Sequence, residues 1–144
     1  ENLSILPDQG DFILTTGEKI GKHKGIIYYT IGQRKGLGIS YQHPLYVVKI
    51  DVPNNQVILG KEEDLYSKVV YITDTNILVD NLPNKVQGKI RYKSAPVSCT
   101  LEIIDDNNMK IIFDEPVKSA TPGQSLVLYN NDILLGGGII KNTE

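Results

Sequence analysis

Cysteine is almost absent from this 144-residue chain, which contains Cys99 alone. A single cysteine excludes an internal disulfide framework, and we expect a reducing, cytoplasmic location. The two histidines, His23 and His43, form no recognisable zinc-ligand spacing with it. The sequence therefore predicts no metal site and leaves Cys99 as the only candidate thiol nucleophile.

Long apolar runs are also absent, and none approaches the ~18–20 residues needed to cross a bilayer. We therefore expect no membrane association, and we recognise no signal peptide. The chain begins at Glu1 without an initiator methionine, so we expect it to be part of a longer protein. Hydrophobic residues make up 40% of the chain, enough for the core of one domain or of one and a half small ones.

Excess positive charge is missing as well, since the net charge is −2. The whole-chain charge thus gives no support to nucleic-acid binding. The local distribution is uneven: the segment 19–35 contains five cations and no acid, whereas the acids gather around 62–64, 105–106 and 114–115. A solvated basic face and a nucleic-acid contact are both consistent with this segment.

Helical periodicity is weak, and β signals dominate. Short runs rich in Tyr, Val, Ile and Thr are broken by Asn, Asp, Gly and Pro. They predict strands at 12–15, 18–21, 46–51, 56–60, 68–72, 86–93, 97–104, 109–115, 125–129 and 133–140. We expect an all-β chain built around a small antiparallel barrel or sandwich, with one short helical turn within 25–33.

The first forty residues differ from the rest, because two short strands are followed by a glycine-rich stretch. The segment 40–44 reads as a connection into the barrel. We therefore expect a small β-rich domain over 1–43 and a β-barrel domain over 44–144.

Cys99 lies in a strand whose alternation places it on the same face as Val97, Leu101 and Ile103. This face is apolar, so we expect Cys99 to be a buried, inert core residue rather than a nucleophile.

The segment Gly32–Gly38 contains three glycines and two adjacent cations, Arg34 and Lys35. Backbone N–H groups and cations in such a loop can hold a phosphate, so both residues are candidate RNA contacts. The segment is neither a P-loop nor a dinucleotide-binding fingerprint. A flexible glycine turn explains it equally well.

The run Val86–Lys93 alternates, with Lys89, Arg91 and Lys93 on one face. Alternate residues of a strand lie about 6.6 Å apart, a spacing that can follow a sugar–phosphate backbone. Tyr92 near the strand end can stack on a base. A charged edge strand protected by lysines is the other interpretation.

Two glycine motifs have structural explanations. Thr121–Gln124 predicts a type II turn, with Pro122 and Gly123 at its centre and Gln124 at the loop edge. Gly136–Gly138 lies inside a strand pattern and predicts a bulge or a close backbone approach.

Taken together, these motifs resemble the tRNA-specific 2-thiouridylase family. They occur in the family's order and approximate spacing and cover nearly the whole chain. The matching segments are His23–Gly25, Tyr29–Ile39 (Tyr-Thr-Ile-Gly-Gln-Arg-Lys-Gly-Leu-Gly-Ile), Leu45–Val48, Arg91–Tyr92, Cys99, Phe113–Pro116, Thr121–Gln124 and Leu135–Ile140. The loop 40–44 is shorter than in some members of the family.

The resemblance implies the C-terminal part of an enzyme that thiolates the wobble uridine (U34) of tRNA. ATP and Mg²⁺ would act in an N-terminal domain, and a sulfur-relay protein would supply the sulfur. The family's phosphate loop and catalytic cysteines have no counterpart in these residues, so we expect the isolated chain to be inactive. The family's tRNA contacts match Arg91, Tyr92 and Gln124, on a barrel similar to domain 2 of translation factors.

Two other interpretations stay open at this point. One is a translation-factor-like barrel that binds RNA or protein without any role in thiolation. The other is a free-standing enzyme that uses Cys99, which the expected burial of that residue disfavours.

Overall fold

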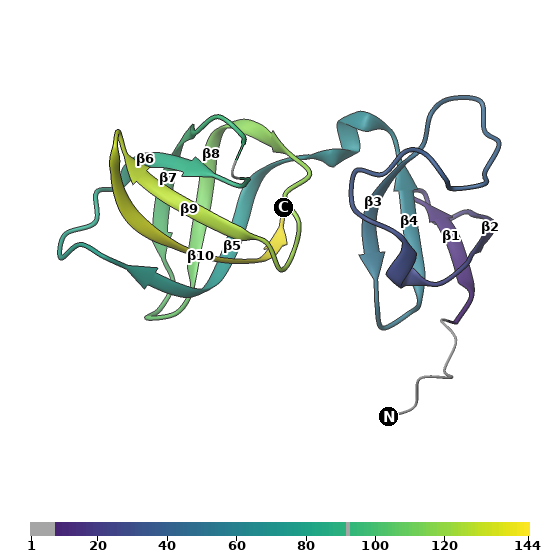
Figure 1. Cartoon of the computed structure of the whole chain (residues 1–144), viewed down its shortest axis with the longest axis horizontal. Helices are drawn as coiled ribbons and strands as arrows, with labels where there is room; N and C mark the ends of the chain where they lie inside the picture. Colours follow the sequence, from purple (N-terminus) through teal and green to yellow (C-terminus); the bar gives the residue numbers. More distant parts are fainter. Residues whose placement is uncertain (1–7, 92) are drawn as a thin grey trace. The chain divides into compact units, whose positions relative to one another are not determined.

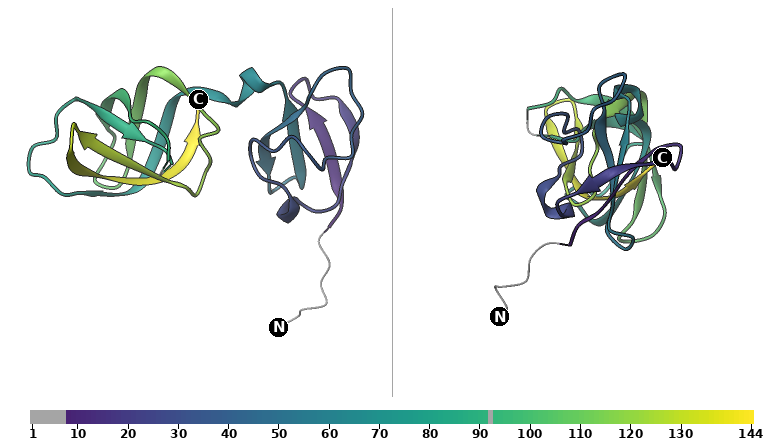
Figure 2. Two further views of the ribbon diagram at one scale, coloured as in Figure 1. Left: turned by 45° about the horizontal axis from the view of Figure 1, so that its top comes forward. Right: turned by 90° about the vertical axis from the view of Figure 1, so that its right-hand side faces the viewer.

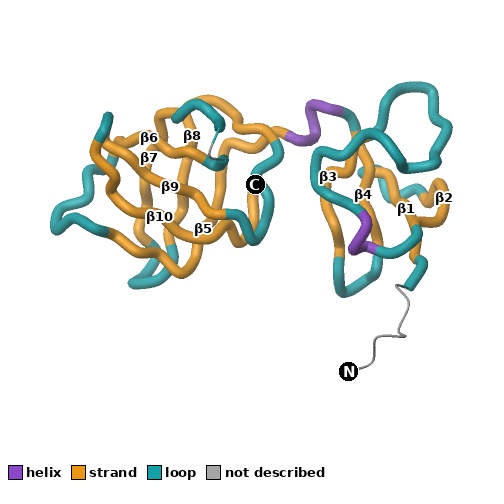
Figure 3. The backbone as a smooth tube through the Cα atoms, viewed as in Figure 1, coloured by secondary structure: helices purple, strands orange, loops and turns teal. Residues whose placement is uncertain are grey.

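The computed structural model describes residues 8–91 and 93–144. Within these ranges the chain forms ten strands and two short 3₁₀ turns, so the all-β prediction is confirmed (Figures 1 and 3). A search of the described helices finds none with the length and apolar character needed to span a membrane.

The chain divides into two compact units between Leu65 and Tyr66. The sequence prediction began the barrel domain at residue 44, whereas in the structure the second unit begins at Tyr66. The reason is the pairing of the predicted hairpin 46–60: its second strand hydrogen-bonds in parallel with the first strand of the chain, not with the barrel. Turn residues correctly predicted this hairpin, but they contain no information about the sheet that it joins.

The first unit contains a four-stranded sheet in the order β2-β1-β4-β3 (Figure 1). Its strands are β1 (Gly10–Leu14), β2 (Lys19–His23), β3 (Tyr46–Asp51) and β4 (Gln56–Gly60). Only the β1–β4 pair within this sheet is parallel. The buried core of the unit is apolar and aromatic and comprises Phe12, Leu14, Tyr29, Leu37, Leu45, Val47, Val57 and Leu59.

The long connection between β2 and β3 begins with the 3₁₀ turn η1 (Ile26–Tyr28), within the range predicted for a helical turn. Backbone hydrogen bonds then attach it to β3, from the Gly32 N–H to the Val47 carbonyl at 2.8 Å and from the Val47 N–H to the Gln33 carbonyl at 2.9 Å. The glycine-rich segment is therefore fixed to the sheet at its start.

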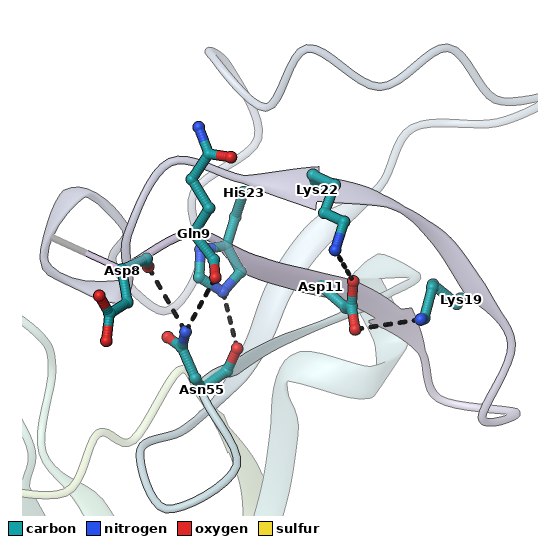
Figure 4. Close-up of polar contacts among 7 residues, drawn as sticks. All are labelled: Asp8, Gln9, Asp11, Lys19, Lys22, His23 and Asn55. Atoms are coloured by element: carbon teal, nitrogen blue, oxygen red, sulfur yellow. Dashed lines mark hydrogen bonds and ion pairs between the residues drawn. The ribbon is translucent and has the colours of Figure 1, made fainter.

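His23 holds three segments of the first unit together, and it is 1% exposed. Its Nδ1 accepts a hydrogen bond from the Gly25 N–H at 2.9 Å, so Nε2 carries the ring hydrogen. Nε2 donates to the Asn55 carbonyl in the β3–β4 turn, also at 2.9 Å (Figure 4). A Cβ on the paired residue Gly10 would lie 2.6 Å from this nitrogen, so glycine is required there.

Asp11 on β1 forms ion pairs with both Lys19 (3.3 Å) and Lys22 (3.2 Å) of β2 (Figure 4). Desolvation raises the pKa of Asp11, but the hydrogen bonds and charges of Lys22 and Lys19 outweigh it and leave the pKa below its usual value. Two of the five cations counted in the segment 19–35 are thus paired with an acid of their own sheet.

The second unit is a closed antiparallel barrel of six strands in the order β10-β5-β8-β7-β6-β9. These strands curl around a common axis (Figures 1 and 2). They are β5 (Tyr66–Ile77), β6 (Lys85–Lys89), β7 (Val97–Ile103), β8 (Met109–Lys118), β9 (Ser125–Asn130) and β10 (Ile133–Thr143). β5 is longer than the predicted 68–72, whereas β6 ends four residues before the predicted 93.

Cys99 is fully buried in the barrel core, as its strand parity predicted. Its sulfur lies within 3.3 Å of the position that a Cβ on Gly88 would take, and the Phe113 ring covers the same glycine. Burial raises the pKa of the Cys99 thiol to about 11, and the nearby Asp114 carboxylate adds to this. Ile103, expected on the same face, is instead 70% exposed, because it is the last residue of its strand.

The triple glycine in β10 permits the close approach predicted from the sequence. Gly136 has φ 134°, and a Cβ there would lie 2.0 Å from the Asn76 carbonyl oxygen. A Cβ on Gly137 would lie 2.1 Å from the Leu126 carbonyl oxygen, and the strand register shifts on both sides of this segment. The bulge therefore bends β10 between β5 and β9 and helps to close the barrel.

Replacing His23 with Ala should destabilise the first unit by about 2–4 kcal/mol, since it leaves the buried Gly25 N–H and Asn55 carbonyl without a partner. Amide hydrogen exchange should accelerate in β1 and β2 and stay unchanged in β5–β10. His43→Ala, which removes a partly exposed imidazole, serves as the control. Equal effects of the two substitutions would show that the His23 hydrogen bonds contribute no special stability.

The Cys99 thiol should react slowly with thiol reagents in the native state, because burial excludes the reagent and its raised pKa leaves almost no thiolate at neutral pH. Cys99→Ala should cost about 1–2 kcal/mol through a small cavity. The rate of thiol labelling with and without urea measures the protection of Cys99. Urea unfolding of Cys99→Ala measures the loss of stability. Native labelling as fast as labelling in urea would contradict the burial.

Candidate nucleic-acid interface

The two ends of the barrel carry opposite charge. Because all neighbouring strands are antiparallel, the connections 90–96 and 119–124 lie at one end, which we call the cationic end. They contain Arg91 and Lys93 and no acid. The connections 78–84, 104–108 and 131–132 lie at the other, acidic end and contain four aspartates and no Lys or Arg.

Arg91 follows the end of β6 at the cationic end, and its guanidinium binds main-chain carbonyls of the neighbouring segment. Its Nη2 donates to the Ser119 carbonyl at 2.8 Å, and its Nη1 donates to the Lys118 carbonyl at 3.2 Å. Ser94 fixes the backbone of Arg91, because its hydroxyl accepts from the Arg91 N–H at 3.1 Å and donates to the Arg91 carbonyl at 2.8 Å. The charge of Arg91 is thereby held at the surface in one place.

Ser119 connects Arg91 with the predicted turn. It is buried and has a left-handed backbone, with φ 58°. The Ser119 carbonyl accepts a second hydrogen bond from the Thr121 hydroxyl at 2.8 Å. Gly123 has φ 94°, and the Gln124 N–H donates to the Thr121 carbonyl at 3.1 Å, which confirms the turn at Thr121–Gln124.

Gln124 leaves this turn with a side-chain oxygen that is buried and has no hydrogen-bond partner within the described residues. Its backbone carbonyl accepts from the Ile140 N–H at 2.8 Å, which fixes the residue against β10. Because this oxygen is closed to solvent, an RNA strand can reach it only after the side chain turns outward. Arg91 contacts the start of the segment 118–124 and Gln124 stands at its end, so a patch built from a strand end and a separate turn is compatible with the fold.

The other candidates from this strand are placed differently from the prediction. Lys89 is half-buried at the end of β6, and Lys93 is exposed in the following turn. Ser94 hydrogen-bonds back to Arg91, so the chain turns away from the strand after β6. Lys89, Arg91 and Lys93 therefore do not form the evenly spaced row on one strand face that the sequence predicted. Tyr92 lies outside the described residues.

Arg34 and Lys35 lie exposed in the glycine-rich loop of the first unit. Gln33 shapes this loop from within, since its side-chain oxygen accepts from the Thr30 N–H at 3.0 Å and its side-chain nitrogen donates to the Lys35 carbonyl at 2.9 Å. Gly36 and Gly38 have φ values of 79° and 69°, which favour glycine. The loop therefore has a defined shape instead of being only a flexible turn.

Sequence reasoning did not single out Ser94 or Ser119, and it named Thr121 only as the first residue of the predicted turn. Serine is a common turn residue, but the carbonyls that Arg91 binds come from a segment remote in the chain. Among the described residues, no group of three or more His, Cys, Asp or Glu side chains converges as a metal ion would require.

Comparison with known proteins matches both units separately. Residues 4–61 match the family model of a tRNA methyl transferase PRC-barrel domain, and residues 65–140 match that of an aminomethyltransferase beta-barrel domain. The second match begins at residue 65, one residue before the structural boundary at Tyr66.

Full-length relatives show the same relationship. The tRNA-specific 2-thiouridylase MnmA of Clostridioides difficile is 46% identical over 139 residues, covering 94% of this chain and 38% of the relative. The enzyme of the same name from Acetivibrio thermocellus is 47% identical over 135 residues, covering 92% and 38%. That of Halothermothrix orenii is 46% identical over 144 residues, covering 98% and 40%. The chain spans about two fifths of the length of these relatives. With two domain models and these identities in agreement, the chain belongs to the tRNA-specific 2-thiouridylase family.

Proposed function

We propose that this chain is the tRNA-contacting, C-terminal part of a cytoplasmic tRNA 2-thiouridylase. The observation that carries the proposal is the binding of Arg91 to the start of the segment 118–124, whose last residue is Gln124, at the cationic end of the barrel. Arg91 provides a permanent charge and a planar donor group for phosphate or a base edge. Gln124, which is half-buried at the edge of the turn, adds an amide group, and Tyr92 adds a ring for stacking.

The charge distribution supports the cationic end as the side that faces RNA. Phosphates are attracted by Lys and Arg and repelled by carboxylates. The connections 90–96 and 119–124 contain no acid, although Glu144 follows β10 at this end, whereas the connections at the opposite end contain four aspartates. Lys89 and Lys93 add positive charge to the same end, and Arg34 and Lys35 offer a second contact on the first unit.

The chemistry of the whole enzyme is the remaining part of the proposal. ATP and Mg²⁺ would activate the wobble uridine in a domain outside these 144 residues, and a sulfur-relay protein would supply the sulfur. The role of the present chain is to hold and orient the tRNA, and Cys99 takes no part because it is buried in the barrel core.

Arg91→Ala should weaken tRNA binding by the chain by about 1–3 kcal/mol. It should also flatten the dependence of affinity on salt, since one phosphate contact is lost. Arg91→Lys keeps the charge but cannot bind both carbonyls, so it should recover the salt slope and only part of the affinity. Lys110→Ala, which removes a cation at the start of β8, is the control for net charge. Fluorescence anisotropy with tRNA over a range of salt concentrations measures each case, and an Arg91→Ala variant that binds like Lys110→Ala would refute the assignment.

The isolated chain should incorporate no sulfur into tRNA and hydrolyse no ATP, because its sequence has no phosphate loop and its single thiol is buried. The assay supplies tRNA, ATP, Mg²⁺ and a sulfide donor and detects 2-thiouridine by mass spectrometry. ATP-dependent thiolation by this chain alone would overturn the division of roles proposed above.

A further inference from the structure

The loop that follows the glycine-rich segment surrounds an open hollow of about 630 Å³ in the first unit. All of its lining residues fall between Arg34 and Leu45. Two leucines in this loop, Leu37 and Leu45, are buried in the core of the unit, and Ile39 packs over Gly21. The walls are therefore anchored, and the volume suits a group of the size of a nucleotide.

The charged groups that line the hollow are of positive sign. Among the described residues that line it, Arg34 is the only Lys or Arg, and none is an Asp or Glu. A neighbouring hollow shares Tyr41 and His43 as a wall and is also lined by Lys61, Glu63 and Asp64. The Arg34 side of this wall has a cation and no carboxylate, so it is the side that favours an anion.

Tyr41 and His43 form this wall as an edge-to-face pair, with ring centroids 5.0 Å apart and an interplanar angle of 86°. Tyr41 is 39% exposed, so part of its ring is open to a ligand. The Nδ1 of His43 lies 3.0 Å from the Pro44 carbonyl oxygen. That oxygen can only accept, so Nδ1 carries the ring hydrogen and Nε2 of the neutral imidazole is a bare acceptor.

We propose that this hollow binds one unpaired ribonucleotide of an RNA strand. The base stacks on Tyr41, the phosphate pairs with Arg34, and the ribose 2′-hydroxyl donates to His43 Nε2. The 2′-hydroxyl is the group that separates RNA from DNA at a protein site. The proposal rests on the tRNA-binding function above and adds to it a site, and a source of selectivity for ribose, on the first unit.

The chemistry of the wall favours a nucleotide over a free anion. Inorganic phosphate would use Arg34 alone and leave the Tyr41 ring and the His43 acceptor unused. A ribonucleotide uses all three, because it combines an anion, a π-face and a hydroxyl donor.

The test compares a short oligouridylate with its 2′-deoxy counterpart by fluorescence anisotropy at low salt, and uses tRNA in parallel. The unmodified chain should bind the RNA about fivefold more tightly than the DNA, the effect of one added hydrogen bond. His43→Phe keeps a ring beside Tyr41 but removes the acceptor, so it should weaken RNA binding to the level of DNA and leave DNA binding unchanged. Tyr41→Ala should weaken both about tenfold, and Tyr41→Leu repeats this loss with an apolar side chain in place.

Arg91→Ala, in the other unit, separates this inference from the proposed function. It should weaken tRNA binding without changing the ratio between RNA and DNA. The ribonucleotide site is wrong if the unmodified chain shows no preference for RNA. It is also wrong if His43→Phe leaves the ratio between RNA and DNA binding unchanged, or if Tyr41→Leu binds both as tightly as the unmodified chain. In each of these cases an effect of Arg91→Ala would still support tRNA binding. If none of the three positions affects tRNA binding, both proposals fail. Amide spectra of β1–β4 verify that the Tyr41 and His43 variants are folded, and those of β5–β10 verify this for Arg91→Ala.

Discussion

The guanidinium of Arg91 binds the main-chain carbonyls of Lys118 and Ser119, and the shape of the candidate RNA surface depends on this interaction. Ser119 has a left-handed backbone, which costs energy for a residue other than glycine. Two donors on its carbonyl, from Arg91 and Thr121, offset that cost and fix the start of the Thr121–Gln124 turn. Arg91 therefore both contributes charge to the surface and holds the loop that presents Gln124. A lysine offers a point charge without the planar pair of donors, so it cannot replace both roles.

The separation of charge between the connections at the two ends of the barrel would let a chain with a net charge of −2 present a cationic surface to RNA. Acids occupy the connections at one end, and the connections at the other end contain none. Antiparallel closure of six strands determines which connections share an end, so the fold converts a mixed sequence into two opposite surfaces. In the first unit, by contrast, Lys19 and Lys22 share the single carboxylate of Asp11, and Arg34 and Lys35 are the cations of the glycine-rich loop.

Local structure was predictable from the sequence because it follows from local rules. Alternation correctly placed Cys99 in the core, turn chemistry located the hairpins, and Gly136–Gly138 correctly indicated a bulge. The domain boundary was wrong because the parallel pairing of β1 with β4 joins segments about forty residues apart, and no turn residue encodes it. The extent of β6 was wrong because Ser94 bends the chain back onto Arg91. The link between Arg91 and Ser119 was unpredictable for a related reason, since main-chain carbonyls leave no signal in a sequence.

The most direct test of a tRNA surface at the cationic end is a map of the amide signals that change when tRNA is added to the isotopically labelled chain. The account predicts changes at residues 89–94 and 118–124 and none at 78–84, 104–108 and 131–132. The changes should disappear as salt is raised, because phosphate contacts release bound counterions. Changes centred on the four aspartates of the acidic end, or none in the barrel, would contradict the account.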